Sequence, residues 1–115
     1  MATDSIAKEK SMAFSIRIVR LYQYLTTEHK EFILSKQILR CGTSIGANIA
    51  EAIYGSSRKD FVAKLQIALK ECAETIYWLE LLHHCDYLSD QMFQSLFEDC
   101  EVLRKILSSS VKSSQ

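Results

Sequence analysis

Apolar side chains recur along this chain at intervals of three and four residues, in four separate stretches. Because one turn of an α-helix takes 3.6 residues, this spacing predicts four amphipathic helices. We place them at residues 4–27, 35–54, 58–84 and 89–107. The breaks near residues 28–34, 55–57 and 85–89 are short, and short connections make consecutive helices antiparallel neighbours. The pattern therefore predicts an all-α fold, an antiparallel up-down-up-down four-helix bundle that occupies residues 1–107.

The connection between the second and third helices carries specific boundary signals. Gly55 is expected to end the second helix because glycine tolerates the positive φ of a helix C-terminus. Ser57 is expected to cap the third helix, with Asp60 three residues further on. Residues 108–115 contain five serines and one apolar residue. Such a segment is too polar to pack, and it is predicted to form a frayed or disordered tail.

Some apolar residues fall outside the predicted core stripes. Met12, Ile16 and Val19 lie off the core stripe of the first helix, and the third helix is apolar on nearly all sides over residues 77–82. A small soluble protein with a second apolar surface is expected to bury it against another subunit. Trp78 is the predicted interface residue. If Trp78 lies in the bundle core instead, its replacement by aspartate should unfold the subunit.

The second helix contains a run of small residues, from Cys41 to Ala52. Gly42 and Gly46 are one turn apart, and each costs a helix interior about 1 kcal/mol relative to alanine. Their presence suggests a neighbouring backbone that comes too close for a larger side chain. Ser44, Asn48 and Glu51 form a separate polar strip beside the isoleucines of this helix. We interpret this strip as structural, with hydrogen bonds to neighbouring helices or subunits, because no nucleophile and base can be assembled from it.

Four segments of the chain resemble one bacterial protein family. They are Phe32-Ile-Leu-Ser-Lys-Gln-Ile-Leu-Arg40, Thr43-Ser-Ile-Gly-Ala-Asn-Ile-Ala-Glu51, Lys59-Asp-Phe61 and Tyr77-Trp-Leu-Glu-Leu-Leu82. These segments are similar to the four-helix bundle proteins encoded in 23S rRNA intervening sequences. The resemblance implies a homopentameric ring, no established catalytic residues, and kinship with an accessory protein of diversity-generating retroelements. One departure is Ala52, where the family commonly has glycine.

Composition narrows the remaining possibilities. The chain has 115 residues, no proline, three glycines and a formal net charge of zero. The lack of helix breakers favours helices over a sheet, and the neutral charge means that any nucleic-acid binding must come from a local patch. The four cysteines form no Cys-x-x-Cys pair and follow no secretory leader, which predicts reduced thiols in the cytoplasm. No apolar run approaches the length of a membrane span.

Candidate chemical sites are few. The topology brings His29, His83, His84, Cys85 and Asp86 to one end, but their spacing matches no zinc pattern, and no metal site is predicted. Cys41, Cys72 and Cys100 fall at similar heights and are expected to pack in the core. The tyrosines and Trp78 are expected in core or interface positions rather than as base-stacking platforms. Without a phosphate loop or nucleophile constellation, we expect no catalytic residue, no cofactor and no enzyme.

Charge is segregated along the predicted bundle. Seven basic residues are expected to share one end: Lys8, Lys10, Arg58, Lys59, Lys64, Arg104 and Lys105. The opposite end carries acidic residues: Glu28, Glu31, Glu80, Asp86 and Asp90. We therefore expect an oligomeric accessory protein that binds RNA, DNA or a ribonucleoprotein through the basic face of its ring. The alternative is a protein scaffold or adaptor without nucleic-acid binding, and the acidic end suits a basic protein partner.

Overall fold

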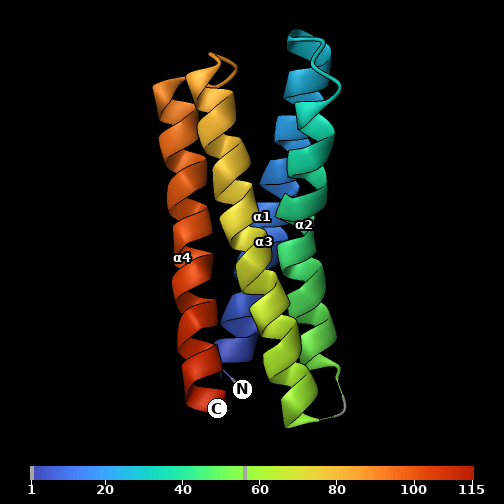
Figure 1. Cartoon of the computed structure of the whole chain (residues 1–115), viewed down its shortest axis with the longest axis vertical. Helices are drawn as coiled ribbons and strands as arrows, with labels where there is room; N and C mark the ends of the chain where they lie inside the picture. The colour runs from blue at the N-terminus through green and yellow to red at the C-terminus, as the bar shows by residue number, and fades with distance from the viewer. Residues whose placement is uncertain (1, 56) are drawn as a thin grey trace.

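A computed structural model of the protein describes residues 2–55 and 57–115, and these form four helices. The helices are α1 (Ala2–Glu28), α2 (Leu34–Ile53), α3 (Arg58–His84) and α4 (Asp90–Ser114). They run alternately in opposite directions, so that both termini and the α2–α3 connection share one end (Figure 1). The other two connections share the opposite end. The predicted all-α antiparallel four-helix bundle is therefore confirmed, with its three breaks at the predicted places.

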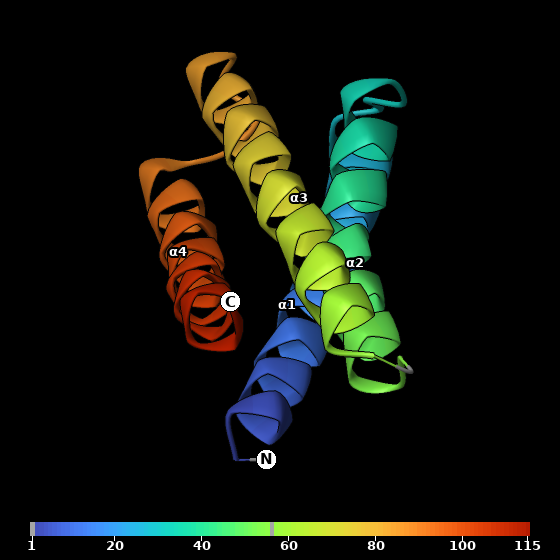
Figure 2. The ribbon, with the colours of Figure 1, turned by 60° about the horizontal axis from the view of Figure 1, so that its bottom comes forward.

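Each helix packs against two neighbours in the order α1, α2, α3, α4, and the α1–α4 seam is the least extensive of the four. Viewed obliquely, α1 and α4 diverge from each other (Figure 2). The core contains the predicted helical stripes. Their fully buried members include Phe14, Ile18, Leu25, Ile38, Ile45, Ile49, Leu79, Leu103 and Leu107. Burial of each such side chain stabilises the fold by about 1.5–3 kcal/mol, so the bundle depends mainly on these stripes.

Serine hydroxyls cap the N-termini of α3 and α4. The Ser57 hydroxyl accepts a hydrogen bond from the Asp60 N–H at 3.1 Å, which confirms the predicted cap. Ser89 accepts one from the Met92 N–H at the same distance. Helix α2 ends near Gly55 as predicted, with Ile53 as its last residue and Tyr54 (φ −93°) as its C-cap. The reason given for Gly55 is wrong, because Gly55 does not have positive φ. The predicted start of α1 at Asp4 is also too late, since the helix begins at Ala2.

The predicted disordered tail is wrong, because α4 continues to Ser114. Val111 follows Leu103 and Leu107 at four-residue spacing and is buried, with 8% of its surface exposed. Within this segment the Ser113 hydroxyl donates to the Ser109 carbonyl, one turn earlier, at 2.8 Å. One apolar residue in the correct register is therefore enough to extend the helix by nearly two turns.

Glu31 caps α2 from outside the helix. Its carboxylate accepts hydrogen bonds from the backbone N–H groups of Ile33, Leu34 and Ser35, at 3.2, 3.1 and 2.7 Å. The Ser35 hydroxyl donates back to the Glu31 carbonyl at 2.8 Å. Burial alone would raise the pKa of Glu31, but these hydrogen bonds to the ionised form lower it overall. The carboxylate thus satisfies three donors that the helix leaves open.

Replacing Glu31 with glutamine should lower the free energy of unfolding by about 1 kcal/mol at pH 7, the usual value of a helix cap. The folded pKa of Glu31 lies below its unfolded pKa, so the carboxylate stabilises the fold above the unfolded pKa. That contribution is lost as pH falls through the folded pKa. Urea unfolding of both proteins at pH 7 and at pH 3 should show the difference shrinking in acid. An equal difference at both pH values would contradict this role.

Candidate nucleic-acid interface

The seven predicted basic residues all lie in the half of the bundle that contains both termini and the α2–α3 connection, which we call the basic half. Lys8 and Lys10 lie on the first turns of α1. Arg58, Lys59 and Lys64 open α3, and Arg104 and Lys105 lie towards the end of α4. Sequence reasoning omitted Lys112, which lies in the last turn of α4 and is exposed. Antiparallel topology therefore gathers cations from three helices.

Two of these cations are engaged by carboxylates. The Lys64 Nζ lies 3.0 Å from Glu51 Oε1, across the α2–α3 interface. Arg104 donates to both carboxylate oxygens of Glu101, at 2.9 and 3.0 Å. Hydrogen bonding to Arg104 lowers the pKa of Glu101, so this carboxylate stays charged. A phosphate would have to compete with a carboxylate at both positions, which makes Lys64 and Arg104 the weakest members of the set.

Other cations of the basic half point to solvent. Lys10, Lys59 and Lys105 are exposed and form no ion pair with any described residue. Arg58 is also exposed, and its guanidinium makes one long hydrogen bond, 3.4 Å, to the Ser114 carbonyl. Lysine and arginine side chains with free N–H donors are the groups that bind phosphate oxygens. These four residues, together with the exposed Lys112, therefore supply the accessible charge.

An exposed aromatic residue contacts one of the predicted cations, Lys8. Tyr54 has 74% of its surface exposed, at the C-terminal end of α2. The Lys8 Nζ donates to the Tyr54 hydroxyl at 3.0 Å and lies 5.4 Å from the ring centroid. This hydrogen bond raises the pKa of Lys8 and lowers the pKa of Tyr54. Of the two predicted positions, core or interface, the core is excluded for Tyr54, since the stripe of α2 ends at Ala52, and an interface position stays a prediction.

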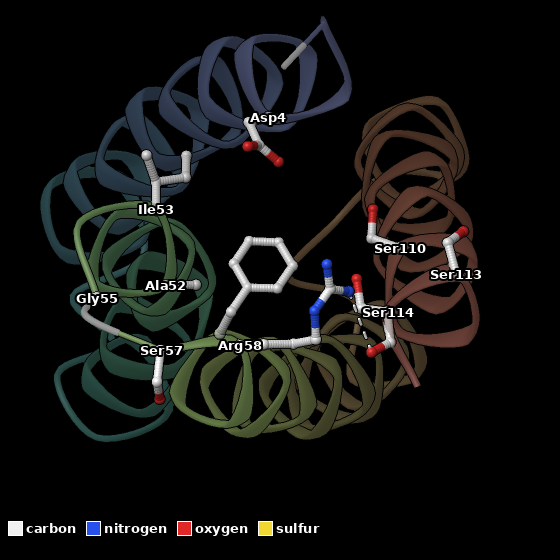
Figure 3. Close-up of a pocket in the computed structure, with 10 residues that line it drawn as sticks. Asp4, Ala52, Ile53, Gly55, Ser57, Arg58, Ser110, Ser113 and Ser114 are labelled. Atoms are coloured by element: carbon white, nitrogen blue, oxygen red, sulfur yellow. Dashed lines mark hydrogen bonds between the residues drawn. The ribbon is translucent and has the colours of Figure 1, made fainter.

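The end of the basic half is hollowed into an open pocket of about 540 Å³, to which all four helices contribute (Figure 3). Its lining residues are Asp4, Ala52, Ile53, Gly55, Ser57, Arg58, Phe61, Ser110, Ser113 and Ser114. The Arg58 guanidinium and the Asp4 carboxylate point into it from α3 and α1. No local pattern in the sequence signals this pocket, because it depends on how the four helix ends are arranged.

The predicted structural strip on α2 divides into two parts. The Ser44 hydroxyl donates to the Arg40 carbonyl at 2.7 Å, and the Asn48 amide donates to the Ser44 carbonyl at 2.9 Å. Both bonds stay within α2, so Ser44 and Asn48 form no hydrogen bond to a neighbouring helix among the described residues, and bonds to another subunit stay a prediction. Glu51 does reach the next helix, through Lys64. The strip is half-exposed along α2 rather than buried in the core.

Trp78 lies between core and solvent. Its ring is half-buried, and its Nε1–H donates to a Glu74 carboxylate oxygen at 3.1 Å. Arg40 of α2 donates to the same oxygen, and it also lies 3.8 Å from Glu71 Oε2. The indole thereby joins an ion-pair group on the α2–α3 surface. Tyr77 beside it is 56% exposed, which leaves a mixed aromatic and charged surface there.

The histidines are dispersed at the opposite end of the bundle. His29 lies edge-on against Tyr24 and Tyr87, with ring centroids 5.1 and 5.3 Å away. His83 Nε2 lies 2.7 Å from Asp90 Oδ1. Within residues 2–55 and 57–115, no group of three or more histidine, cysteine or carboxylate side chains is arranged to hold a metal ion.

Three of the four cysteines pack in the core, as predicted. The Thr75 hydroxyl donates to Cys41 Sγ at 3.3 Å, and the Cys100 thiol donates to the Cys72 carbonyl at 3.7 Å. Burial raises the pKa of the Cys41 thiol to about 11. Hydrogen bonding to Cys72, together with burial, raises the pKa of Cys100 as well. Protonated thiols are poor nucleophiles, so Cys41 and Cys100 act as small apolar side chains.

In the part of the chain that the structure describes, no helix has the length and apolar character needed to cross a membrane. No curated protein is significantly similar to the chain. A crystal structure of a protein of unknown function from the S23 ribosomal protein family of Bacteroides thetaiotaomicron is similar throughout. It has a TM-score of 0.94 and 52% sequence identity, over 96% of this chain and 98% of that one. The model of the 23S rRNA-intervening sequence protein family matches residues 3–109, and the chain belongs to that family.

Proposed function

We propose that the protein is a non-enzymatic, homo-oligomeric accessory protein of the cytoplasm that binds RNA, DNA or a ribonucleoprotein through its basic half. The observation that carries the proposal is the accessible charge at one end. Lys59 and Lys105 are exposed there, Arg58 lines the open pocket, and the exposed ring of Tyr54 lies at the same end in contact with Lys8. Cations release counterions from a phosphate backbone, and an aromatic ring offers a surface on which a base stacks.

Oligomerisation multiplies this local charge. In a ring with cyclic symmetry, the same end of every subunit lies on the same face. A patch too weak to bind alone is then repeated around one face, although the net charge of the chain stays at zero. Resemblance to the family favours a pentamer. Contacts to phosphates would give strong salt dependence and little sequence specificity.

The opposite half of the bundle suits a different partner. Glu28, Glu80, Asp86 and Asp90 are exposed there. A face of this charge attracts a basic protein surface, and it repels nucleic acid. The protein can therefore hold a nucleic acid at one end and a basic protein at the other.

The test is a titration with single-stranded and duplex RNA and DNA at two salt concentrations. The double variant Arg58→Glu/Lys59→Glu should bind at least about tenfold more weakly at low salt. A plot of log affinity against log salt concentration should also have a shallower slope. The slope should change by about 0.7–0.9 for each phosphate that the variant no longer neutralises. The matched control is Lys30→Glu/Lys36→Glu, which makes the same charge change at exposed positions of the opposite half.

The control variant should bind as the wild type does. The proposal fails if the wild type binds no nucleic acid at low salt. It also fails if Arg58→Glu/Lys59→Glu binds normally while sedimentation shows an intact oligomer. A protein scaffold or adaptor without nucleic-acid binding then takes its place.

A further inference from the structure

The open pocket at the end of the basic half combines a cation, hydroxyl groups, a carboxylate and an aromatic ring. We propose that it binds a single unstacked nucleotide, with the phosphate on Arg58 and the base against Phe61. This inference rests on the proposed function and names its substrate class, a nucleic acid with a single-stranded end. Adenosine monophosphate presents the same chemistry and serves as a probe of the pocket alone.

Arg58 and Phe61 are positioned to act together. They are three residues apart on α3, so they lie on the same side of that helix, and both line the pocket. The single bond of Arg58 to the Ser114 carbonyl leaves most of its five N–H donors unused. Phe61 is half-buried against the core, which fixes its ring while part of its surface remains open. In a nucleotide one sugar separates the phosphate from the base. The spacing of Arg58 and Phe61, one helical turn apart, lets the guanidinium bind the phosphate while the ring contacts the base.

The other polar groups favour a nucleotide over an isolated anion. Ser110 lines the pocket from α4, and hydroxyls contact phosphate oxygens in nucleic-acid complexes. Ser113 also belongs to the lining, but its hydroxyl already donates to the Ser109 carbonyl. Asp4 points in from α1, opposite Arg58, and forms no ion pair with any other described residue. A carboxylate repels a free anion but accepts hydrogen bonds from the amino group of a base. The pocket therefore fits a ligand that is anionic at one side only.

The size and openness of the pocket favour a single-stranded substrate. Its volume of about 540 Å³ falls within the range of about 300–1,000 Å³ usual for small-ligand sites. Bases inside a duplex are stacked on both faces and cannot enter, whereas unpaired bases can be splayed onto aromatic side chains. A strand whose phosphates follow Lys59 and Lys105 can thus place one end nucleotide in the pocket.

The experiment measures adenosine monophosphate binding by ligand-observed NMR on the full-length protein. We expect the base protons to receive saturation from the protein. Phe61→Leu should weaken binding by about tenfold, as removal of a stacking ring does. Arg58→Gln changes an exposed residue and should weaken it similarly without affecting folding. Phe93→Leu is the matched control, a half-buried phenylalanine at the opposite end of the bundle, and it should bind as the wild type does.

The inference is overturned if the nucleotide does not bind, or if Phe61→Leu and Arg58→Gln both bind it normally. It is also overturned if inorganic phosphate competes as well as the nucleotide, because the site would then recognise an anion alone. These failures are distinct from failure of the proposed function. If longer strands still bind with salt dependence but the nucleotide does not, the proposed function stands and only the nucleotide site in the pocket is contradicted.

Discussion

Replacing Gly42 with alanine should destabilise the protein by about 1–3 kcal/mol, whereas the same change at Gly46 should be neutral or stabilising by up to about 1 kcal/mol. A Cβ at Gly42 would lie 2.8 Å from Cγ1 of Ile18 and 2.9 Å from its Cγ2. Ile18 is fully buried on α1, so it cannot move away. At Gly46 the nearest atom is the Ser15 hydroxyl oxygen, at 3.1 Å, and this hydroxyl can rotate.

Urea unfolding of the two single variants measures this contrast. A double-mutant cycle with Ile18→Ala identifies the cause, because removing the isoleucine branches makes room for the new methyl group. Ile18→Ala should cost about 2–5 kcal/mol alone and distinctly less when Gly42 is already alanine. Strict additivity, or a stabilised Gly42→Ala variant, would show that α1 and α2 do not meet this closely.

The same two glycines show how far sequence reasoning reached. Their spacing on α2 predicts a close neighbouring backbone. The structure places α1 there, but a Cβ at Gly42 would meet the Ile18 side chain. Only at Gly46 does a backbone atom, the Ser11 carbonyl oxygen at 3.5 Å, lie among the nearest atoms. The sequence did not identify that neighbour as α1, or Ile18 as the contact. Periodicity determines which face of a helix is apolar, but the residue that this face meets depends on the relative height and rotation of two helices.

Helix ends were predicted unevenly, for physical reasons. The Ser57 cap is predictable because its hydroxyl accepts a hydrogen bond from the N–H only three residues ahead, which is a local pattern. Glu31 was not recognised as a cap, because its carboxylate reaches α2 from within the connection rather than from the helix boundary. The prediction for the tail is wrong because it rests on serine content alone. Val111 continues the buried stripe of α4 at four-residue spacing, and this one residue keeps the segment helical.

The candidate site was predictable in outline only. Antiparallel topology is enough to bring basic residues of α1, α3 and α4 to one half of the bundle. Topology does not show that Arg104 is paired with Glu101, whereas Lys59 forms no ion pair with a described residue. Ion pairs depend on side-chain conformation. The pocket and the Lys8–Tyr54 contact join residues far apart in sequence, and no local pattern encodes either one.

Replacing Ile16 with aspartate should convert the proposed oligomer into folded monomers. Met12, Ile16 and Val19 are 62, 49 and 40% exposed, and they form a stripe at helical spacing on the outer side of α1. Arg20 and Gln23 lie beside them along a shallow groove. A carboxylate is well solvated on a free subunit, but an unpaired one costs several kcal/mol when an interface buries it. Assembly should therefore fail while the fold remains.

Sedimentation equilibrium at micromolar concentration, together with circular dichroism, measures both properties. Val102→Asp is the matched control, because Val102 is also partly exposed, at 43%, but belongs to no apolar stripe. In the described part of α4 no other large apolar side chain is exposed. The control variant should assemble normally. Trp78→Asp should weaken assembly and also lower subunit stability, because the indole is half-buried and bonded to Glu74. If the wild type is monomeric, or if Ile16→Asp assembles as the wild type does, the outer stripe of α1 is not the subunit interface.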